Sequence, residues 1–273
     1  MTNPLFSIII ATKNSELFIK RCLDSIQSQT LQSYQVIISD GLSSDRTKEY
    51  CYEYINTKKI QNFKFLSNAD SSIYEAWNNA LDYVSGAWVI FLGSDDFLST
   101  SSVLSNIQKK INQISTEVNF CLTDVHMSNR STLDIFFTHR VKPWNFQQFN
   151  RFRYCLGMVP HQGVLHRANI FSKTNKFSCK YSIAGDYEFL LRNITLRNVK
   201  SLIGENFSTM SVGGVSGGFA NKKLFDEFLA IANLYNMNKR CISMAKIKFG
   251  IRLFLTKFLS DKNAVNLYSC FRK

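Results

Sequence analysis

The sequence predicts an α/β fold built on a mostly parallel, doubly wound sheet with helices on both faces. Along the first 125 residues, short apolar runs rich in β-formers alternate with stretches whose apolar residues recur at helical spacing. Such alternation is typical of parallel strands joined by crossover helices. With 273 residues, of which 45% are hydrophobic, the chain can bury a sizeable core in one large domain or in one domain with an appendage.

The predicted elements follow one another at short intervals. Leu5–Ile10 is a β-rich apolar run, and the next segment, Glu16–Ile26, spaces its apolar residues as a helix does. The same pair of patterns then repeats. The further predicted strands are Tyr34–Ser39, Phe63–Leu66, Ala87–Leu92 and Val118–Val125, and the further predicted helices are Asp45–Ile55, Ile73–Val84 and Ser101–Ile114.

The positive charge of the chain gathers near its C-terminus. The net charge is +13, and residues 221–273 contain eleven Lys and Arg against three Asp and Glu. We therefore expect a main domain over residues 1–220 and a basic helical extension over residues 221–273. Such a surface attracts nucleic acid, anionic lipid or a phosphate-rich substrate. The basic side chains between Lys239 and Lys257 do not fall on one helical face, so membrane contact and a merely solvated tail both remain open.

The cysteines and the apolar segments indicate a cytoplasmic protein. The seven cysteines are scattered, odd in number and never spaced as Cys-x-x-Cys. This pattern favours reduced thiols over a disulfide framework or a zinc site. The first apolar stretch is too short for a signal or a membrane span, and no later stretch offers about 18 uncharged apolar residues.

Polar clusters follow three of the predicted strands. They are Thr12-Lys13-Asn14, the segment from Asp40 to Asp45, and Gly93-Ser94-Asp95-Asp96. Ligands of open parallel sheets bind outside the carboxyl ends of the strands, where these clusters converge if the fold is right. Two adjacent carboxylates at such an edge suit a divalent metal that carries a diphosphate. An Asp-Asp pair also commonly caps a helix or solvates a turn.

Four of these segments, in this order, resemble the motifs of the family 2 glycosyltransferases, which have the GT-A fold. They are Ser7–Asn14, Val36–Asp45, Ile73–Asn78 and Phe91–Asp96. The resemblance continues through Pro160–Gly163 and Ala184–Glu188 to Gly213–Ser216, so it covers roughly residues 5 to 218 and leaves the basic tail outside.

The resemblance implies a nucleotide-sugar donor site on the first half of the chain. It assigns Thr12 and Asp40 to the base and ribose of the nucleotide, most often a uridine in this family, and a carboxylate accepts hydrogen bonds from such groups. Asp70, Tyr74 and Asn78 match the stretch that shapes the donor pocket. From the residues alone, Asp40 also suits a turn before Gly41, and Asp70-Ser71-Ser72 suits a helix N-cap.

The resemblance also implies a metal. Asp96 matches the family's metal ligand, so Mn2+ or Mg2+ is the expected cofactor, and Asp95 matches its partner facing the donor sugar. One departure is Gly93, which stands where many members have a further acid or Asn. It leaves fewer direct ligands for the metal.

Asp186 aligns with the carboxylate that family members use as general base toward the acceptor hydroxyl, a role that a partly buried carboxylate can fill. It also suits the N-cap of a predicted helix Tyr187–Arg197. His161 and Gln162 are expected on the acceptor or diphosphate side, although a lone histidine is often structural. Ser216 lies in the glycine-rich stretch 213–218, expected as a loop near the diphosphate or as an ordinary surface turn.

The resemblance thus implies an inverting transfer of a sugar from a UDP-sugar to a hydroxyl of a saccharide. Relatives of this compact type extend lipid-linked oligosaccharides for bacterial surface polysaccharide such as O-antigen, capsule or exopolysaccharide, and the basic tail suits the anionic inner face of the plasma membrane. Two other classes stay open. One is a nucleotidyltransferase, although no Gly-rich triphosphate loop follows the first strand. The other is a basic protein that binds nucleic acid or membrane without catalysis, although no nucleic-acid-binding motif appears.

Overall fold

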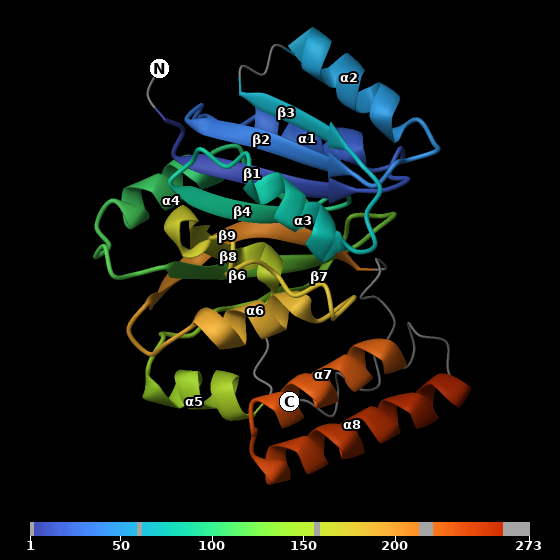
Figure 1. The fold of residues 1–273 in the computed structure, drawn as a ribbon, viewed down its shortest axis with the longest axis vertical. Helices are drawn as coiled ribbons and strands as arrows, with labels where there is room; N and C mark the ends of the chain where they lie inside the picture. Colours follow the sequence, from blue (N-terminus) through green and yellow to red (C-terminus); the bar gives the residue numbers. More distant parts are fainter. Residues whose placement is uncertain (1–2, 59–61, 156–158, 213–220, 259–273) are drawn as a thin grey trace.

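A nine-stranded sheet forms the centre of the molecule (Figure 1). The computed structural model describes residues 3–58, 62–155, 159–212 and 221–258. The first half of the sheet is parallel and has the order β3-β2-β1-β4. Its strands are β1 (Phe6–Thr12), β2 (Tyr34–Asp40), β3 (Phe63–Ser67) and β4 (Trp88–Gly93). This half confirms the first four predicted strands.

The second half of the sheet is mixed. β8 (Val164–Arg167) lies between β4 and β6 (Phe120–Asn129) and is antiparallel to both, and β9 (Val199–Val212) is parallel to β6. β5 (Phe97–Leu98) and β7 (Ile135–His139) pair antiparallel with β9 and β6. The strands β1, β2, β3, β4, β6 and β9 therefore all point the same way, so the sheet is mostly parallel as predicted.

Helices cover both faces of the sheet because successive strand residues point to opposite sides. Ile8 and Ile10 pack with α1 (Ile19–Gln27), α2 (Thr47–Lys58) and α4 (Val103–Ile111) on one face. Ile9 packs with α3 (Ile73–Leu81) and α6 (Gly185–Asn193) on the other. All three isoleucines are fully buried. The two cores hold the strand ends, and hence the polar clusters, in fixed positions.

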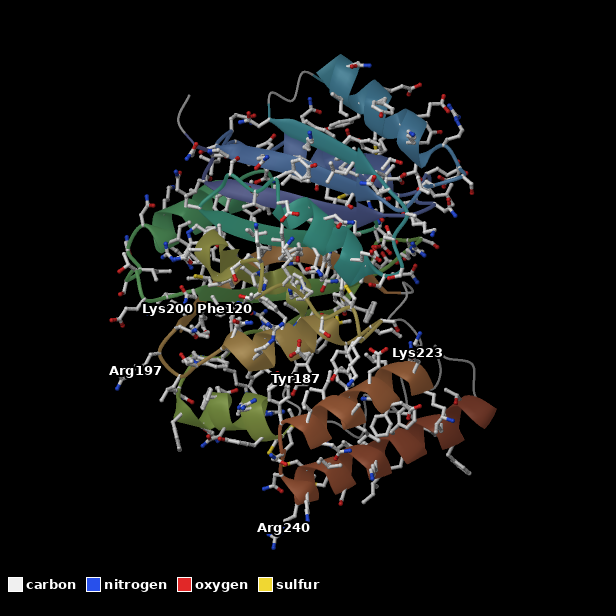
Figure 2. All side chains as sticks on the ribbon, in the orientation of Figure 1. Phe120, Tyr187, Arg197, Lys200, Lys223 and Arg240 are labelled. Carbon is white, nitrogen blue, oxygen red and sulfur yellow. A yellow bond between two sulfur atoms is a disulfide. The ribbon has the colours of Figure 1, made fainter. Side chains whose placement is uncertain are left out.

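The C-terminal part of the described chain is helical, as predicted. α5 (Phe146–Tyr154), α7 (Lys222–Leu234) and α8 (Lys239–Phe258) lie beyond α6, and α8 is the outermost in the lower part of Figure 1. Ile231 and Ala232 of α7 are fully buried in the same core as α3 and α6. Figure 2 labels Tyr187 of α6, whose ring packs edge-on against Phe228 of α7 at 5.4 Å between centroids. Among the residues that the structure describes, none of the helices is long and apolar enough to cross a membrane.

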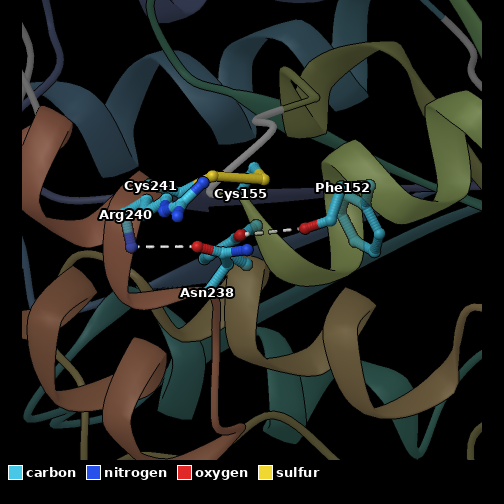
Figure 3. Close-up of a disulfide and its surroundings, with 6 residues drawn as sticks. Phe152, Cys155, Asn238, Arg240 and Cys241 are labelled. Atoms are coloured by element: carbon cyan, nitrogen blue, oxygen red, sulfur yellow. Dashed lines mark hydrogen bonds between the residues drawn. A yellow bond between two sulfur atoms is a disulfide. The ribbon is translucent and has the colours of Figure 1, made fainter.

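The expectation that all cysteines are reduced is wrong for one pair. Cys155, which follows α5, and Cys241, in the first turn of α8, form a disulfide across 86 residues of sequence (Figure 3). Beside it, the backbone nitrogen of Asn238 donates to the backbone oxygen of Tyr154 at 3.0 Å. Chain folding brings these two positions together, which their spacing in sequence does not reveal. Cys22, Cys51, Cys121 and Cys179 are free thiols.

Candidate active site

The register of the parallel strands aligns their polar ends. Thr12 on β1 lies opposite Asp40 on β2, Asp40 lies opposite Ser67 on β3, and Ala11 lies opposite Gly93 on β4. The predicted clusters therefore meet at one edge of the sheet, where ligands of such folds bind.

The first part of this edge is a hydrogen-bonded cluster around Asp40, which we call the Asp40 cluster. The Asp40 carboxylate is buried and accepts hydrogen bonds from the Ser43 backbone nitrogen at 3.1 Å and from Ser67 Oγ at 3.0 Å. The Gly41 nitrogen donates to the Thr12 backbone oxygen at 2.9 Å. Thr12 Oγ1 is buried and has no hydrogen-bond partner within the described part of the chain. Asp40 is thus held rigidly, and the Thr12 hydroxyl is left for a ligand.

Asp70, on the β3–α3 connection, borders the Asp40 cluster. A Cβ atom at position 41 would lie only 2.5 Å from Asp70 Oδ2, so the carboxylate rests directly against Gly41. Burial, together with the charges of Glu75 and Asp40, raises the pKa of Asp70, against the opposing effect of Lys13. The alternative that Asp70-Ser71-Ser72 forms a helix N-cap is confirmed at Ser72, which caps α3 and accepts from the Glu75 nitrogen, whereas Asp70 itself is not the capping residue.

Asn78 occupies a different place. Its amide nitrogen donates to the Phe177 backbone oxygen and its amide oxygen accepts from the Phe177 nitrogen, both at 2.9 Å. This pairing fixes the segment around Phe177 against α3. Asn78 thus supports the walls of the site through the Phe177 backbone.

Asp95 and Asp96 follow β4. The Asp96 side chain is buried, with 2% of the residue exposed, and its Oδ1 accepts from the Ser211 nitrogen at 2.9 Å. Burial and the neighbouring Asp95 raise the pKa of Asp96 to about 7. A Cβ at position 93 would lie 2.6 Å from Asp96 Oδ2 and 3.1 Å from Asp95 Oδ1. Gly93 therefore makes room for the two carboxylates, which accounts for its departure from the motif.

These two carboxylates fit a hard divalent cation. No cluster of three or more His, Cys, Asp and Glu capable of holding a metal occurs among the described residues. A cation such as Mg2+ commonly takes only one or two carboxylates from the protein and completes its shell with phosphate oxygens and water. Asp96, with Asp95 beside it, supplies that donor set.

Two arginines that the sequence did not single out surround the carboxylates. Arg130, in the turn between β6 and β7, pairs with Asp95 Oδ2 at 3.1 Å, and its guanidinium lies 3.9 Å from the centroid of the Phe18 ring. Arg21 of α1 donates to the Asp95 backbone oxygen at 2.6 Å and to Ser211 Oγ at 3.1 Å. This corner therefore combines acidic groups with cations suited to a diphosphate.

His161 and Gln162 separate into two roles. His161 is buried in the core, stacked on Trp77 at 5.0 Å and 4.9 Å from the His166 ring. Burial, and then the neighbouring His166, lower the pKa of His161 well below its usual value. The Gln162 side chain instead hydrogen-bonds the Asp96 carboxylate. Gln162 thus lies at the Asp95–Asp96 corner, whereas His161 packs in the core. Ser216 lies outside the described residues.

Asp186 stands in the first turn of α6. The N-cap of this helix is Ala184, so the capping alternative for Asp186 is wrong. The Tyr74 hydroxyl of α3 shares its one proton between two acceptors, the Ile183 backbone oxygen at 2.5 Å and Asp186 Oδ1 at 3.1 Å. Burial raises the pKa of Asp186 to about 6, although hydrogen bonds from the Tyr187 nitrogen and Tyr74 oppose this. Such a carboxylate accepts a proton effectively near neutral pH.

One chain of contacts links Asp186 to the Asp95–Asp96 corner. Tyr74 lies edge-on to Trp77 at 5.4 Å between centroids, Trp77 stacks on His161, and Gln162 reaches Asp96. Because β1 joins the strand of Asp40 to β4, the Asp40 cluster, the two carboxylates and Asp186 belong to one packed region.

Glu227 of α7 holds the segment that precedes Asp186. Its Oε1 accepts from the Ser182 nitrogen and hydroxyl at 2.9 and 2.8 Å, and its Oε2 accepts from the nitrogens of Ile183 and Ala184 at 2.9 and 2.8 Å. Burial by itself would raise the pKa of Glu227, but these donors outweigh it and lower the pKa. We call this arrangement the Glu227 clamp. Sequence reasoning missed it because residue 227 lies in the basic tail, outside every motif.

If Asp186 is the base that the family resemblance implies, replacing Glu227 by Gln should lower kcat by about 100-fold, because small displacements of a catalytic group cost that much. Binding of UDP, the nucleotide expected from the resemblance, should stay within about twofold. The neutral amide cannot accept all four donors, so the segment ahead of Asp186 shifts. Steady-state kinetics and calorimetric titration with UDP measure the two effects. Asp226→Asn, at an exposed neighbouring position of the same helix, is the control. Equal losses in both variants, or loss of UDP binding, would show that the clamp does not position the base.

Comparison with known proteins identifies the family. The sequence model of the family described as Glycosyl transferase family 2 matches residues 7–173. A PGL/p-HBAD biosynthesis glycosyltransferase of Mycobacterium tuberculosis is 28% identical over 196 residues, which cover 70% of each chain. A chondroitin synthase of Escherichia coli is 28% identical over 190 residues, covering 69% of this chain and 26% of the synthase.

Solved structures share the fold. TarS of S. aureus, in complex with UDP-GlcNAc, superposes with a TM-score of 0.65 at 17% identity, covering 91% of this chain and 72% of the TarS chain. A longer TarS chain is covered only to 43%. The mannosyltransferase PcManGT from Pyrobaculum calidifontis, with GDP-Man and Mn2+, gives 0.64 at 14% identity, covering 100% and 80%. The fold is of the GT-A type, and the chain is a glycosyltransferase that belongs to glycosyl transferase family 2.

Proposed function

We propose that this glycosyltransferase moves a sugar from a UDP-sugar to a hydroxyl of a lipid-linked saccharide, with inversion at the anomeric carbon. The observation that carries the proposal is the position of the Asp186 carboxylate. Tyr74 and the segment bound by Glu227 hold it in one packed region with the Asp40 cluster and the Asp95–Asp96 corner. A base, a nucleotide pocket and a diphosphate corner are the parts that one direct displacement needs.

In this proposal the residues divide the work. Thr12, Asp40 and Asp70 hold the uridine, and Asn78 supports the pocket wall. Asp186 takes the proton of the acceptor hydroxyl as its oxygen forms the bond to the anomeric carbon, while the bond from that carbon to the diphosphate oxygen breaks on the opposite side. Arg130 and Arg21 face the departing UDP.

Asp96 and Asp95 would hold Mn2+ or Mg2+. When bound, such an ion neutralises charge that develops on the diphosphate. Gln162 orients the Asp96 carboxylate, and Ser216 stays a sequence-based candidate for the diphosphate side. The solved neighbours with UDP-GlcNAc and with GDP-Man and Mn2+ support a nucleotide-sugar donor and a divalent ion, and leave the choice of nucleotide to experiment.

The acceptor is proposed from relatives that build glycans. The M. tuberculosis relative is named for PGL/p-HBAD biosynthesis and the E. coli relative for chondroitin synthesis. We infer a place in surface-polysaccharide assembly, where the growing saccharide is carried on a lipid.

The test is a panel of UDP- and GDP-sugars with Mn2+, with release of the free nucleotide as the readout. We expect a UDP-sugar to be turned over, and turnover to increase when a lipid-linked saccharide is added. The anomeric configuration of the product, read by NMR, should be opposite to that of the donor. Preference for a GDP-sugar would correct the nucleotide, and retained configuration would overturn the role given to Asp186.

A further inference from the structure

We propose that α8 docks the protein onto an anionic lipid surface through a stripe of exposed apolar side chains flanked by lysines. The stripe consists of Met244, Ile247, Ile251 and Phe254, which are 56%, 64%, 46% and 62% exposed. Their spacing of three, four and three residues places them on one face of a helix with 3.6 residues per turn. Large apolar side chains gathered on one face mark an interaction surface.

The stripe is distinct from the face by which α8 packs on the protein. Phe249 stacks on Phe225 of α7 at 4.0 Å between ring centroids, and Ile242 packs against the core. At about 100° per residue these two positions lie nearly opposite to Ile247 and Ile251. The helix thus has two apolar faces, one packed within the molecule and one exposed. α8 itself lies at the lower edge of the molecule in Figure 1.

Basic residues border the outward stripe on both sides. Lys239 and Lys246 fall on one flank and Lys248 on the other. Arg240, which opens the stripe at its N-terminal end, projects away from the body of the molecule in Figure 2. The sequence showed correctly that these side chains do not share a face. The packing of α8 in the structure shows in addition that these basic side chains lie around an apolar stripe.

The charges favour lipid over a second copy of the chain. The apolar spacing also suits a pair of helices packed side by side. However, Lys239–Phe258 contains no Asp or Glu, so two copies of this stripe would bring like charges together. An anionic bilayer matches it, because the apolar side chains enter the interface while the lysine stems extend to the headgroups. Each basic residue near such a surface adds to binding.

The test is cosedimentation of the full chain with vesicles of phosphatidylglycerol and phosphatidylcholine, compared with phosphatidylcholine alone. Binding should require the anionic lipid and weaken with salt. Ile247→Ser/Ile251→Ser should reduce the partition coefficient by about tenfold or more, because the variant lacks two apolar side chains that the bilayer would partly bury. Lys246→Glu/Lys248→Glu should reduce it by about tenfold.

The matched control is Lys109→Glu/Lys173→Glu, which changes two exposed lysines elsewhere and the net charge by the same amount. It should bind vesicles nearly as the natural chain does. UDP titration shows whether each variant is folded, and it separates this inference from the proposed reaction. Equal losses in the two charge variants, or no vesicle binding at all, would overturn the proposal. If sedimentation velocity shows a dimer that Ile247→Ser/Ile251→Ser dissociates, with vesicle binding unchanged, the stripe is an interface between copies.

Discussion

Replacing Asp186 by Asn should lower kcat by about 1,000-fold while UDP binding stays within about twofold, because loss of a positioned base typically costs 10²- to 10⁴-fold. The amide keeps the shape of the side chain and its contact with Tyr74, but it cannot take a proton from the acceptor. Burial raises the pKa of Asp186 to about 6. In the natural chain, therefore, kcat/KM should rise through about pH 6 as the carboxylate deprotonates, and level off above it.

Steady-state kinetics between pH 5 and 8, with calorimetric titration of UDP, check both parts. The Asn variant should lose this dependence along with its rate, while Asp226→Asn keeps both. If the variant retains its turnover, another group is the base. If it no longer binds UDP, Asp186 belongs to the donor pocket instead.

Replacing Asp96 by Asn should weaken Mn2+-dependent binding of UDP by about 100-fold or more. Removing a residue that only supports a metal ligand lowers metal affinity by about 10- to 100-fold, and loss of a direct ligand should cost more. The Asn side chain still accepts from the Ser211 nitrogen, so the turn should hold, but the negative charge is gone. Calorimetry with UDP, with and without Mn2+, measures the difference. UDP binding that never depended on the metal would show that Arg130 and Arg21 carry the diphosphate by themselves.

Asp124→Asn gives this experiment a matched control, because Asp124 is an equally buried carboxylate, 2% exposed, on β6. It accepts from the Val141 nitrogen at 2.8 Å, away from the Asp95–Asp96 corner. Its replacement should leave the metal dependence of UDP binding unchanged. A similar loss in both variants would point to general loss of structure.

The first half of the fold and the meeting of its polar strand ends were predictable because their signals are local. The strands β1, β2 and β4 are continuous apolar runs buried on both faces, and the polar residues that end them, such as Thr12, Asp40 and Asp95, become neighbours once parallel register is assumed. Family motifs then predicted different roles for residues that composition alone does not distinguish.

The rest depends on contacts between distant segments. Glu227 and Arg130 occupy stretches without a motif, and only the packing of α7 and of the β6–β7 turn brings them to the site. The antiparallel strand β8 is only four residues long, which is too short for a reliable pattern. For α8, helical spacing was readable, but which of its two apolar faces is covered depends on Phe225 of a neighbouring helix.

The disulfide between Cys155 and Cys241 makes part of the chain a covalent ring. Asp186 and Glu227 lie on that ring, whereas the strands of the donor pocket lie on the open arm before it. A single backbone cut anywhere between the two cysteines therefore opens the ring without dividing the protein into separate molecules. As long as the disulfide is intact, a chain cut once within the ring therefore keeps α7, and with it the Glu227 clamp, covalently linked to the part of the protein that carries Asp186.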